Sequence, residues 1–210
     1  VGTKLIFSGF LDSLDRYNSE LYPSDIVLIF DEPTGTWSTS HLSQARSFVA
    51  CAGNDSLAVF AGGYYGLYYA SDVVDIYNVN TGQWSVQHLS QARGVVRGAY
   101  CNGKFYFGGG SIGLPVSSSS DVVDIWDGIN WSVDHLSAPR TDVAVVAVGN
   151  DVYFMGGGDL DFSTNFCSRT YYNVDVLHTA DNTWHRFDMP KDLEASAYTT
   201  SGNHIIVGGG

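Results

Sequence analysis

The chain has 210 residues, of which 44% are hydrophobic and 15% charged, so it is long enough to bury a core. Its formal net charge is -12, and its 10 Lys and Arg residues form no run, which argues against a nucleic-acid-binding surface. An acidic surface of this kind favours solubility or a basic partner. No stretch of 18 apolar residues occurs, so we predict no membrane span.

The cysteines bear on the cellular compartment. Cys51, Cys101 and Cys167 are too few and too scattered for a disulfide framework or a zinc ribbon, and an odd count favours reduced thiols. The first residues lack the long apolar segment of a signal peptide. Two N-glycosylation sequons begin at Asn54 and Asn130, as expected by chance in a chain rich in Ser and Thr. We therefore favour a cytoplasmic location over a secreted one.

Aromatic, basic and glycine residues recur along the chain at a fixed period. A spacing of 47 residues separates Trp37, Trp84 and Trp131. The same spacing separates Arg46, Arg93 and Arg140, and also the glycine pairs that begin at Gly62, Gly109 and Gly156. Trp184 follows after 53 residues, and the extra length falls mainly between residues 159 and 172. Repeats of this length, with insertions confined to one place, predict stacked supersecondary units.

Each unit contains four short apolar runs. In the second whole unit they are Val95–Cys101, Lys104–Phe107, Val122–Trp126 and Asn130–Val133. The runs are rich in Val, Ile, Tyr and Phe, and turn sequences such as Asn102-Gly103 separate them, which predicts antiparallel strands joined by hairpins. Four strands per unit, repeated radially, are typical of a β-propeller.

This pattern resembles the Kelch repeat, whose signature is a Gly doublet after the second strand, then a Tyr-like residue, then a Trp. In one unit these residues are Gly109-Gly110, Trp126 in the Tyr position, and Trp131. The other copies read Gly62-Gly63, Tyr77 and Trp84; Gly156-Gly157, Leu177 and Trp184; and, more weakly, Ser8-Gly9, Phe30 and Trp37. The resemblance implies an all-β, Kelch-type β-propeller built from four-stranded antiparallel blades.

The repeat divides the chain into one propeller region with five parts. We expect a partial blade in residues 1–41, whole blades in residues 42–88, 89–135 and 136–188, and a partial blade in residues 189–210. The two partial blades cannot complete each other, because both include a second strand. Kelch-like proteins usually close with six or seven blades, so we expect these four blades' worth of chain to belong to a longer protein.

Three arginines are the first candidates for a binding site. Arg46, Arg93 and Arg140 each open the first, innermost strand of a blade, so we expect them to converge near the mouth of the central channel. In Kelch domains that bind acidic peptides, matching arginines often touch the ligand, so the resemblance implies a ligand-binding role. The alternative is a structural role, in which each Arg bonds a neighbouring blade's carbonyl groups or an Asp. The next unit carries Lys191 to Glu194 without an Arg, so the ring of arginines is incomplete.

The loops between the second and third strands flank the same mouth. They cover residues 10–24, 64–71, 111–120 and 159–171, and they vary in length. Variable, Tyr-rich loops on a rigid scaffold are typical binding surfaces. We predict ligand-binding roles for Tyr64, Tyr65, Asp161 and Phe162. The alternative is that these loops are merely solvated.

Repeated His and Asp residues allow weaker inferences. His41, His88 and His135 each follow a Trp by four residues, and we predict a structural role without metal because the outer edges of successive blades diverge. The sequence Asp-Val-Val-Asp occurs at residues 72–75 and 121–124. Strand alternation points its two carboxylates to opposite faces, so we predict turn or edge positions that aid solubility rather than an acid/base pair.

No catalytic residue, metal or cofactor is predicted. The chain contains no phosphate-binding loop before a helix, no Gly-x-Ser-x-Gly and no HExxH. Cys167 lies near Tyr171 and Tyr172, which resembles the Cys–Tyr element of galactose-oxidase-type copper enzymes, but no matching His pair accompanies it.

Three functions remain open. The first is a non-enzymatic protein-binding or scaffold module that holds a partner segment, in particular an acidic one, at the propeller mouth. The second is a secreted or surface protein that binds or modifies carbohydrate. The third is a structural component of a large assembly with other chains. A non-enzymatic role is favoured, while the enzyme question stays open.

Overall fold

The computed structural model describes residues 1–8, 11–15, 20–66, 68–116, 118–161, 166–192 and 197–208. Within these residues the protein is all-β, with 23 strands, no helix and only antiparallel pairing between neighbouring strands. The described residues therefore contain no helix that is long and apolar enough to cross a membrane. The prediction of an all-β, antiparallel protein is confirmed.

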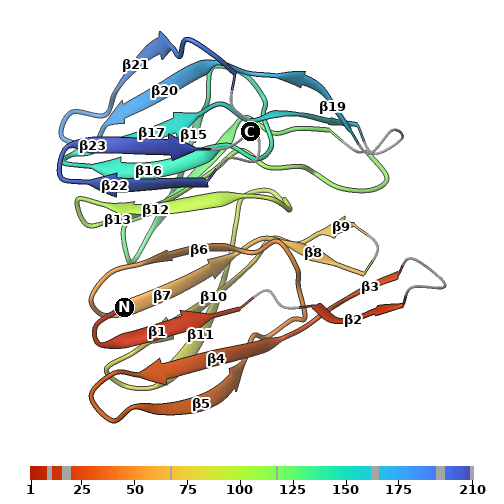
Figure 1. Cartoon of the computed structure of the whole chain (residues 1–210), viewed down its shortest axis with the longest axis vertical. Helices are drawn as coiled ribbons and strands as arrows, with labels where there is room; N and C mark the ends of the chain where they lie inside the picture. Colours follow the sequence, from red (N-terminus) through yellow and green to blue (C-terminus); the bar gives the residue numbers. More distant parts are fainter. Residues whose placement is uncertain are drawn as a thin grey trace.

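The main strands form four sheets and a hairpin in chain order (Figure 1). Sheet I contains β1 (Lys4–Phe7), β4 (Ile26–Asp31) and β5 (Thr36–His41). Sheet II contains β6 (Ala50–Gly53), β7 (Leu57–Ala61), β10 (Val73–Asn78) and β11 (Gln83–His88). Sheet III contains β12 (Arg97–Cys101), β13 (Lys104–Gly108), β14 (Val122–Trp126) and β15 (Trp131–His135). Sheet IV contains β16 (Ala144–Val148), β17 (Asp151–Met155), β20 (Asn173–His178) and β21 (Thr183–Asp188), and hairpin V contains β22 (Ala197–Ser201) and β23 (His204–Gly208).

Three of the predicted loops contain short hairpins of their own. They are formed by β2 (Leu11–Asp15) with β3 (Glu20–Pro23), β8 (Tyr64–Tyr65) with β9 (Tyr69–Ala70), and β18 (Gly158–Asp161) with β19 (Phe166–Thr170). Each connects the second strand of a sheet to the third. Figure 1 shows β2, β3, β8, β9 and β19 at the same end of the sheets, on the right of the view. The loop residues are thus held by backbone pairing at one end of the molecule.

The strands of sheet III agree with the predicted runs to within two residues at each end. Asn102 and Gly103 both have positive φ, 46° and 83°, as the predicted tight hairpin turn requires. The first strand begins at Arg97 rather than Val95, because Val95 has a φ of 53° and cannot continue a strand. Phe48 and Asp142 occupy the same position in sheets II and IV and have similar φ values of 53° and 54°. The local backbone is therefore repeated although the residue types differ.

The sheets pack face to face through the side chains of their second strands. Phe60, Phe107 and Phe154 hold equivalent positions and are 2%, 0% and 0% exposed. Phe107 belongs to the core cluster shared by sheets II and III, and Phe154 to the cluster shared by sheets III and IV. Burying a side chain of this size contributes roughly 1.5–3 kcal/mol, so these repeated contacts are a main source of stability.

The second strand of sheet I, β1, is more exposed than the second strands of the other three sheets. Among the described residues β1 pairs only with β4, whereas β7, β13 and β17 each pair with a first strand as well. Phe7, the equivalent of Phe60, is 45% exposed, and Leu5 beside it is 56% exposed. Phe60 is covered by Val27 and Ile29 of sheet I. Among the described residues no sheet lies against Phe7 in the same way.

Candidate functional site

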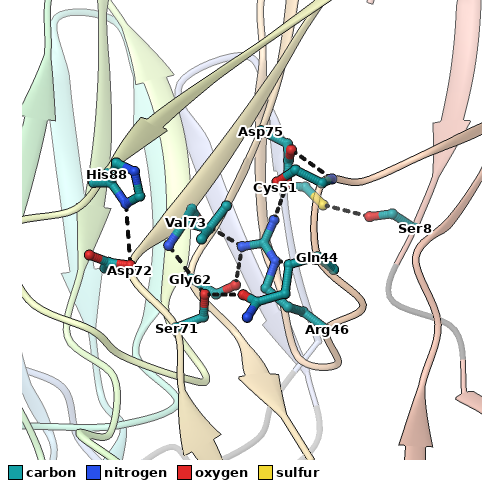
Figure 2. Close-up of polar contacts among 11 residues, drawn as sticks. Ser8, Gln44, Arg46, Cys51, Gly62, Ser71, Asp72, Val73, Asp75 and His88 are labelled. Carbon is teal, nitrogen blue, oxygen red and sulfur yellow. Dashed lines mark hydrogen bonds and ion pairs between the residues drawn. The ribbon is translucent and has the colours of Figure 1, made fainter.

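The side chain of Arg46 ties two strands of sheet II together. Its Nη1 donates to the carbonyl oxygens of Gly62 and Val73, both at 2.6 Å, and its Nη2 is paired with the carboxylate of Asp75. Figure 2 shows the guanidinium lying between Asp75 and these carbonyl groups. Gly62 follows the second strand and Val73 opens the third, so the arginine binds both strand ends at once.

Sheets III and IV repeat this cluster. Arg93 donates to the carbonyl oxygens of Gly109 and Val122, at 2.5 and 2.7 Å, and is paired with Asp124. Arg140 donates to the carbonyl oxygens of Gly156 and Asn173, at 3.1 and 2.9 Å, and is paired with Asp175. We call these three groupings the Arg–Asp clusters.

All three guanidinium groups are buried. Arg46, Arg93 and Arg140 are each 0% exposed. Burial lowers the pKa of each guanidinium below the usual arginine value, and the paired aspartate opposes that shift. A buried charge is tolerated only when it is paired and hydrogen-bonded, and each cluster meets this requirement with one carboxylate and two carbonyl groups.

This geometry favours the structural alternative that the sequence left open. The arginines bond carbonyl groups and an Asp of their own sheet rather than of a neighbouring one. None of these three guanidinium groups reaches solvent in the structure, so none of them offers a free cation at the surface. A ligand-binding role for Arg46, Arg93 and Arg140 stays a prediction.

The interpretation of Asp-Val-Val-Asp as a solubility element is wrong for its second Asp. Asp75 and Asp124 are 1% and 0% exposed and are the partners of Arg46 and Arg93. A second donor, the backbone N–H of Ser43, binds Oδ1 of Asp75 at 2.9 Å. The signal in the sequence was that this Asp recurs together with the Arg in each whole unit.

The first Asp of the motif lies at the edge of the sheet beside a histidine. Nδ1 of His88 is 3.3 Å from Oδ1 of Asp72, and Nδ1 of His135 is 3.3 Å from Oδ1 of Asp121. Figure 2 marks the contact between His88 and Asp72 with a dashed line. His41 is 3.1 Å from Asp25 in sheet I. Within the part of the chain that the structure describes, no group of three or more His, Cys, Asp or Glu side chains could hold a metal ion.

Tyr64, one of the predicted ligand-binding residues, lies in the interior of the described structure. It is 2% exposed, and its ring lies against the backbone of Gly94, where an added Cβ would approach the ring to 2.2 Å. Burial raises its pKa to about 12. Tyr64 also pairs with Ser47 through the backbone, so it anchors the β8–β9 hairpin to the first-strand segment of sheet II.

Tyr65 and Tyr69 face solvent on that anchored hairpin. They are 42% and 49% exposed, and their rings stack with centroids 5.8 Å apart. Phe48 is 47% exposed and meets the ring of Tyr64 edge-on at 6.2 Å. Among the predicted ligand-binding residues, the structure thus exposes Tyr65. Phe162 lies outside the described residues, and of Asp161 only the backbone, in β18, is described.

The sequence reasoning missed one polar contact between sheets. Nη2 of Arg97, which begins β12, is 2.7 Å from Oδ1 of Asp142 in the segment that leads to β16. The two side chains are 33% and 25% exposed. Neither residue recurs in the other units, so the repeat period offered no signal for this contact.

Comparison with known proteins supports the fold. No protein-family model matches the chain, and no curated protein matches it. Among solved structures the chain is similar to that of YjhT, with a TM-score of 0.75 and 11% sequence identity. The match covers 98% of this chain and 73% of the YjhT chain. At so low an identity the similarity concerns the fold alone.

Proposed function

We propose that sheets I to IV are blades of a Kelch-type β-propeller and that hairpin V begins a further blade of a six- or seven-bladed ring. Three observations support this. The strands of sheets II, III and IV are ordered as they occur in the chain, each sheet packs on the next through equivalent side chains, and the Arg–Asp clusters recur in register.

Within that fold, we propose that the protein is a non-enzymatic module that binds a partner protein segment at the end of the sheets where the β8–β9 hairpin lies. One observation carries this proposal: Tyr65 and Tyr69 are stacked and exposed on a hairpin whose base, Tyr64, is buried. Aromatic side chains held rigidly at a surface bury much area at little entropic cost, as binding surfaces require.

The chemistry of the partner follows from which groups are free. The expectation of an acidic segment depended on exposed arginines, and these are paired and buried. Tyr65 and Tyr69 instead offer flat aromatic faces with hydroxyl groups at their edges. Such faces fit a segment with apolar or planar side chains, for which charge is secondary.

Peptide selection tests this function directly. Displayed peptides would be selected on the wild-type chain, and the affinity of a selected peptide measured against Tyr65→Ala/Tyr69→Ala. We expect the double variant to weaken binding by at least about tenfold, because it removes both rings. The matched control is Phe187→Ala, which removes an aromatic side chain that is 52% exposed on β21, and it should leave binding unchanged.

Carbohydrate binding is the second candidate, because a stacked tyrosine pair also suits a sugar ring. A glycan array with the same variants separates the two. Glycan binding that depends on Tyr65 and Tyr69, with no peptide selected on the wild-type chain, would replace the first proposal by the second. Selected peptides that bind both variants equally would contradict a site at this hairpin.

A further inference from the structure

A cavity between the outer strands of sheets III and IV departs from the repeat. It has a volume of about 310 Å³ and is lined by His135, Ser137, Asp175, Trp184, His185 and Arg186. Its lining comes from β15 and the residues after it and from β20 and β21, so it does not include the β8–β9 hairpin. The cavity is large enough for a small organic molecule.

The residue that distinguishes this cavity is Arg186. The equivalent positions, two residues after the repeated Trp, are Val86 in sheet II and Val133 in sheet III. Trp184 and Arg186 lie two residues apart and therefore share one face of β21. That face is turned towards sheet III, as shown by the hydrogen bond of 2.8 Å from Nε1 of Trp184 to Asp134. Arg186 is exposed and has no ion pair among the described residues.

The neighbouring carboxylate is also arranged differently. In sheets II and III the backbone N–H of a serine, Ser43 or Ser90, donates to Oδ1 of the cluster's Asp, both at 2.9 Å. In sheet IV the N–H and Oγ of Ser137 both donate to Oδ2 of Asp175, the oxygen that also pairs with Arg140. Within the described residues Oδ1 of Asp175 therefore receives no hydrogen bond.

The Arg140–Asp175 cluster has more positive charge around it than the clusters of Arg46 and Arg93. Asp175 and Arg186 are directly opposite on neighbouring strands, so a second arginine lies beside the Arg140–Asp175 pair. Burial lowers the pKa of Arg140, Asp175 opposes this, and Arg186 lowers it further. In the sister clusters a second carboxylate, Asp72 or Asp121, instead raises the pKa of the arginine, and Tyr172 stands at that position in sheet IV.

One carboxylate on β21 could offset this charge. Asp188 stands where the sister units carry His41, His88 and His135, and it is two residues beyond Arg186. No ion pair joins it to Arg186 in the described part of the chain, and it does not line the cavity. Arg186 thus keeps its donors free within a protein whose net charge is -12.

We propose that this cavity binds a small organic anion, with its carboxylate on Arg186 and its flat apolar part against Trp184. Guanidinium groups bind carboxylates through paired hydrogen bonds. The half-buried indole of Trp184 supplies an apolar wall, and Arg140 neutralises Asp175, which would otherwise repel the ligand.

Benzoate and benzamide test this proposal, because they have the same shape and differ in charge. The readout is the indole N–H signal of Trp184 in proton–nitrogen NMR spectra of the whole chain, assigned by its loss in Trp184→Phe. We expect benzoate to shift this signal saturably, with a Kd on the order of millimolar, and benzamide to bind at least about tenfold more weakly. Acetate, which lacks the flat part, should also bind more weakly than benzoate.

Arg186→Val is the decisive variant, because it restores the residue of the sister sheets and so should fold normally. It should weaken benzoate binding by about tenfold or more, with Arg186→Lys in between. The control is Lys191→Val, which makes the same charge change at an exposed lysine outside the cavity and should bind as the wild type does. The proposal is overturned by the absence of a saturable benzoate shift, by equal binding of benzamide, or by undiminished binding to Arg186→Val.

Discussion

The guanidinium of Arg93 is paired with the carboxylate of Asp124, and neither side chain is exposed to solvent. The same arginine also holds the carbonyl oxygens of Gly109, which follows the second strand, and Val122, which opens the third. Arg93 lies just before the first strand, β12, and its side chain fastens the second and third strands. The binding surface we propose rests on tyrosines, and the arginines support the sheets from which those tyrosines project.

Replacing Arg93 by Ala should destabilise the protein by about 3–5 kcal/mol, because it leaves Asp124 buried without a partner. Urea unfolding monitored by fluorescence and circular dichroism would measure this. The double replacement Arg93→Met/Asp124→Leu removes both charges and should recover most of the loss, since apolar pairs of similar volume replace buried ion pairs at little cost. If the single variant is as stable as the wild type, the Arg–Asp clusters do not support the sheets.

Replacing Gly94 by Ala should destabilise the protein by about 1–3 kcal/mol, because the new methyl group would meet the ring of Tyr64 at 2.2 Å. The matched control is Gly208→Ala in β23, where an added Cβ meets nothing within 4 Å, and it should be neutral. Combining Gly94→Ala with Tyr64→Ala tests the cause. The two changes together should cost less than the sum of their separate effects, because the second removes the clash. Strict additivity would show that the ring does not rest on Gly94.

Stability should fall in alkaline solution as tyrosines ionise in the unfolded chain. Burial raises the pKa of Tyr64 and of Tyr106 to about 12 in the folded protein. The ordinary value is about 10, so this contribution is complete below pH 10 and is lost as the pH rises towards 12. Urea midpoints measured across this range should depend less on pH in Tyr106→Phe, whereas the exposed Tyr172 replaced by Phe should leave the slope unchanged. An identical slope in Tyr106→Phe would contradict the assignment.

Two indole hydrogen bonds between neighbouring sheets should differ in strength. Nε1 of Trp184 donates to the carboxylate of Asp134 at 2.8 Å, and Nε1 of Trp84 donates to the hydroxyl of Ser40 at 2.9 Å. A bond to a charged acceptor contributes roughly 1.5–3 kcal/mol and one to a neutral acceptor about 0.5–1.5 kcal/mol. Asp134→Ala should therefore lower the free energy of unfolding more than Ser40→Ala does. The reverse order would show that the charge of Asp134 is compensated by solvent.

The sequence predicted the strands of the repeat well, because each strand carries its own apolar pattern and its own turn residues. Asn102-Gly103 needs only local backbone chemistry, and the structure places the turn there. The roles of the side chains were harder to predict, since they depend on which strands come together. Asp75 lies 29 residues after Arg46, and only the pairing order of the sheet brings them into contact.

The sequence pattern also could not predict which side chains of the loops are buried. Tyr64 and Tyr65 are neighbours in a Tyr-rich loop, yet one is 2% and the other 42% exposed, because strand alternation turns only Tyr64 towards Gly94. Arg186 could have been noticed because sheets II and III carry Val at its position of the repeat. Its candidate role follows only from the structure, which shows the cavity that Arg186 lines and places Asp175 opposite it.

The most direct test of this division of roles is the affinity of a selected peptide for Arg93→Met/Asp124→Leu. If the arginines support the sheets and the tyrosines bind the partner, this variant should bind the peptide as tightly as the wild type, while Tyr65→Ala/Tyr69→Ala should bind at least about tenfold more weakly. A folded Arg93→Met/Asp124→Leu protein, verified by its circular dichroism and unfolding midpoint, that has lost the peptide would contradict the account. Arg93 would then be a binding residue.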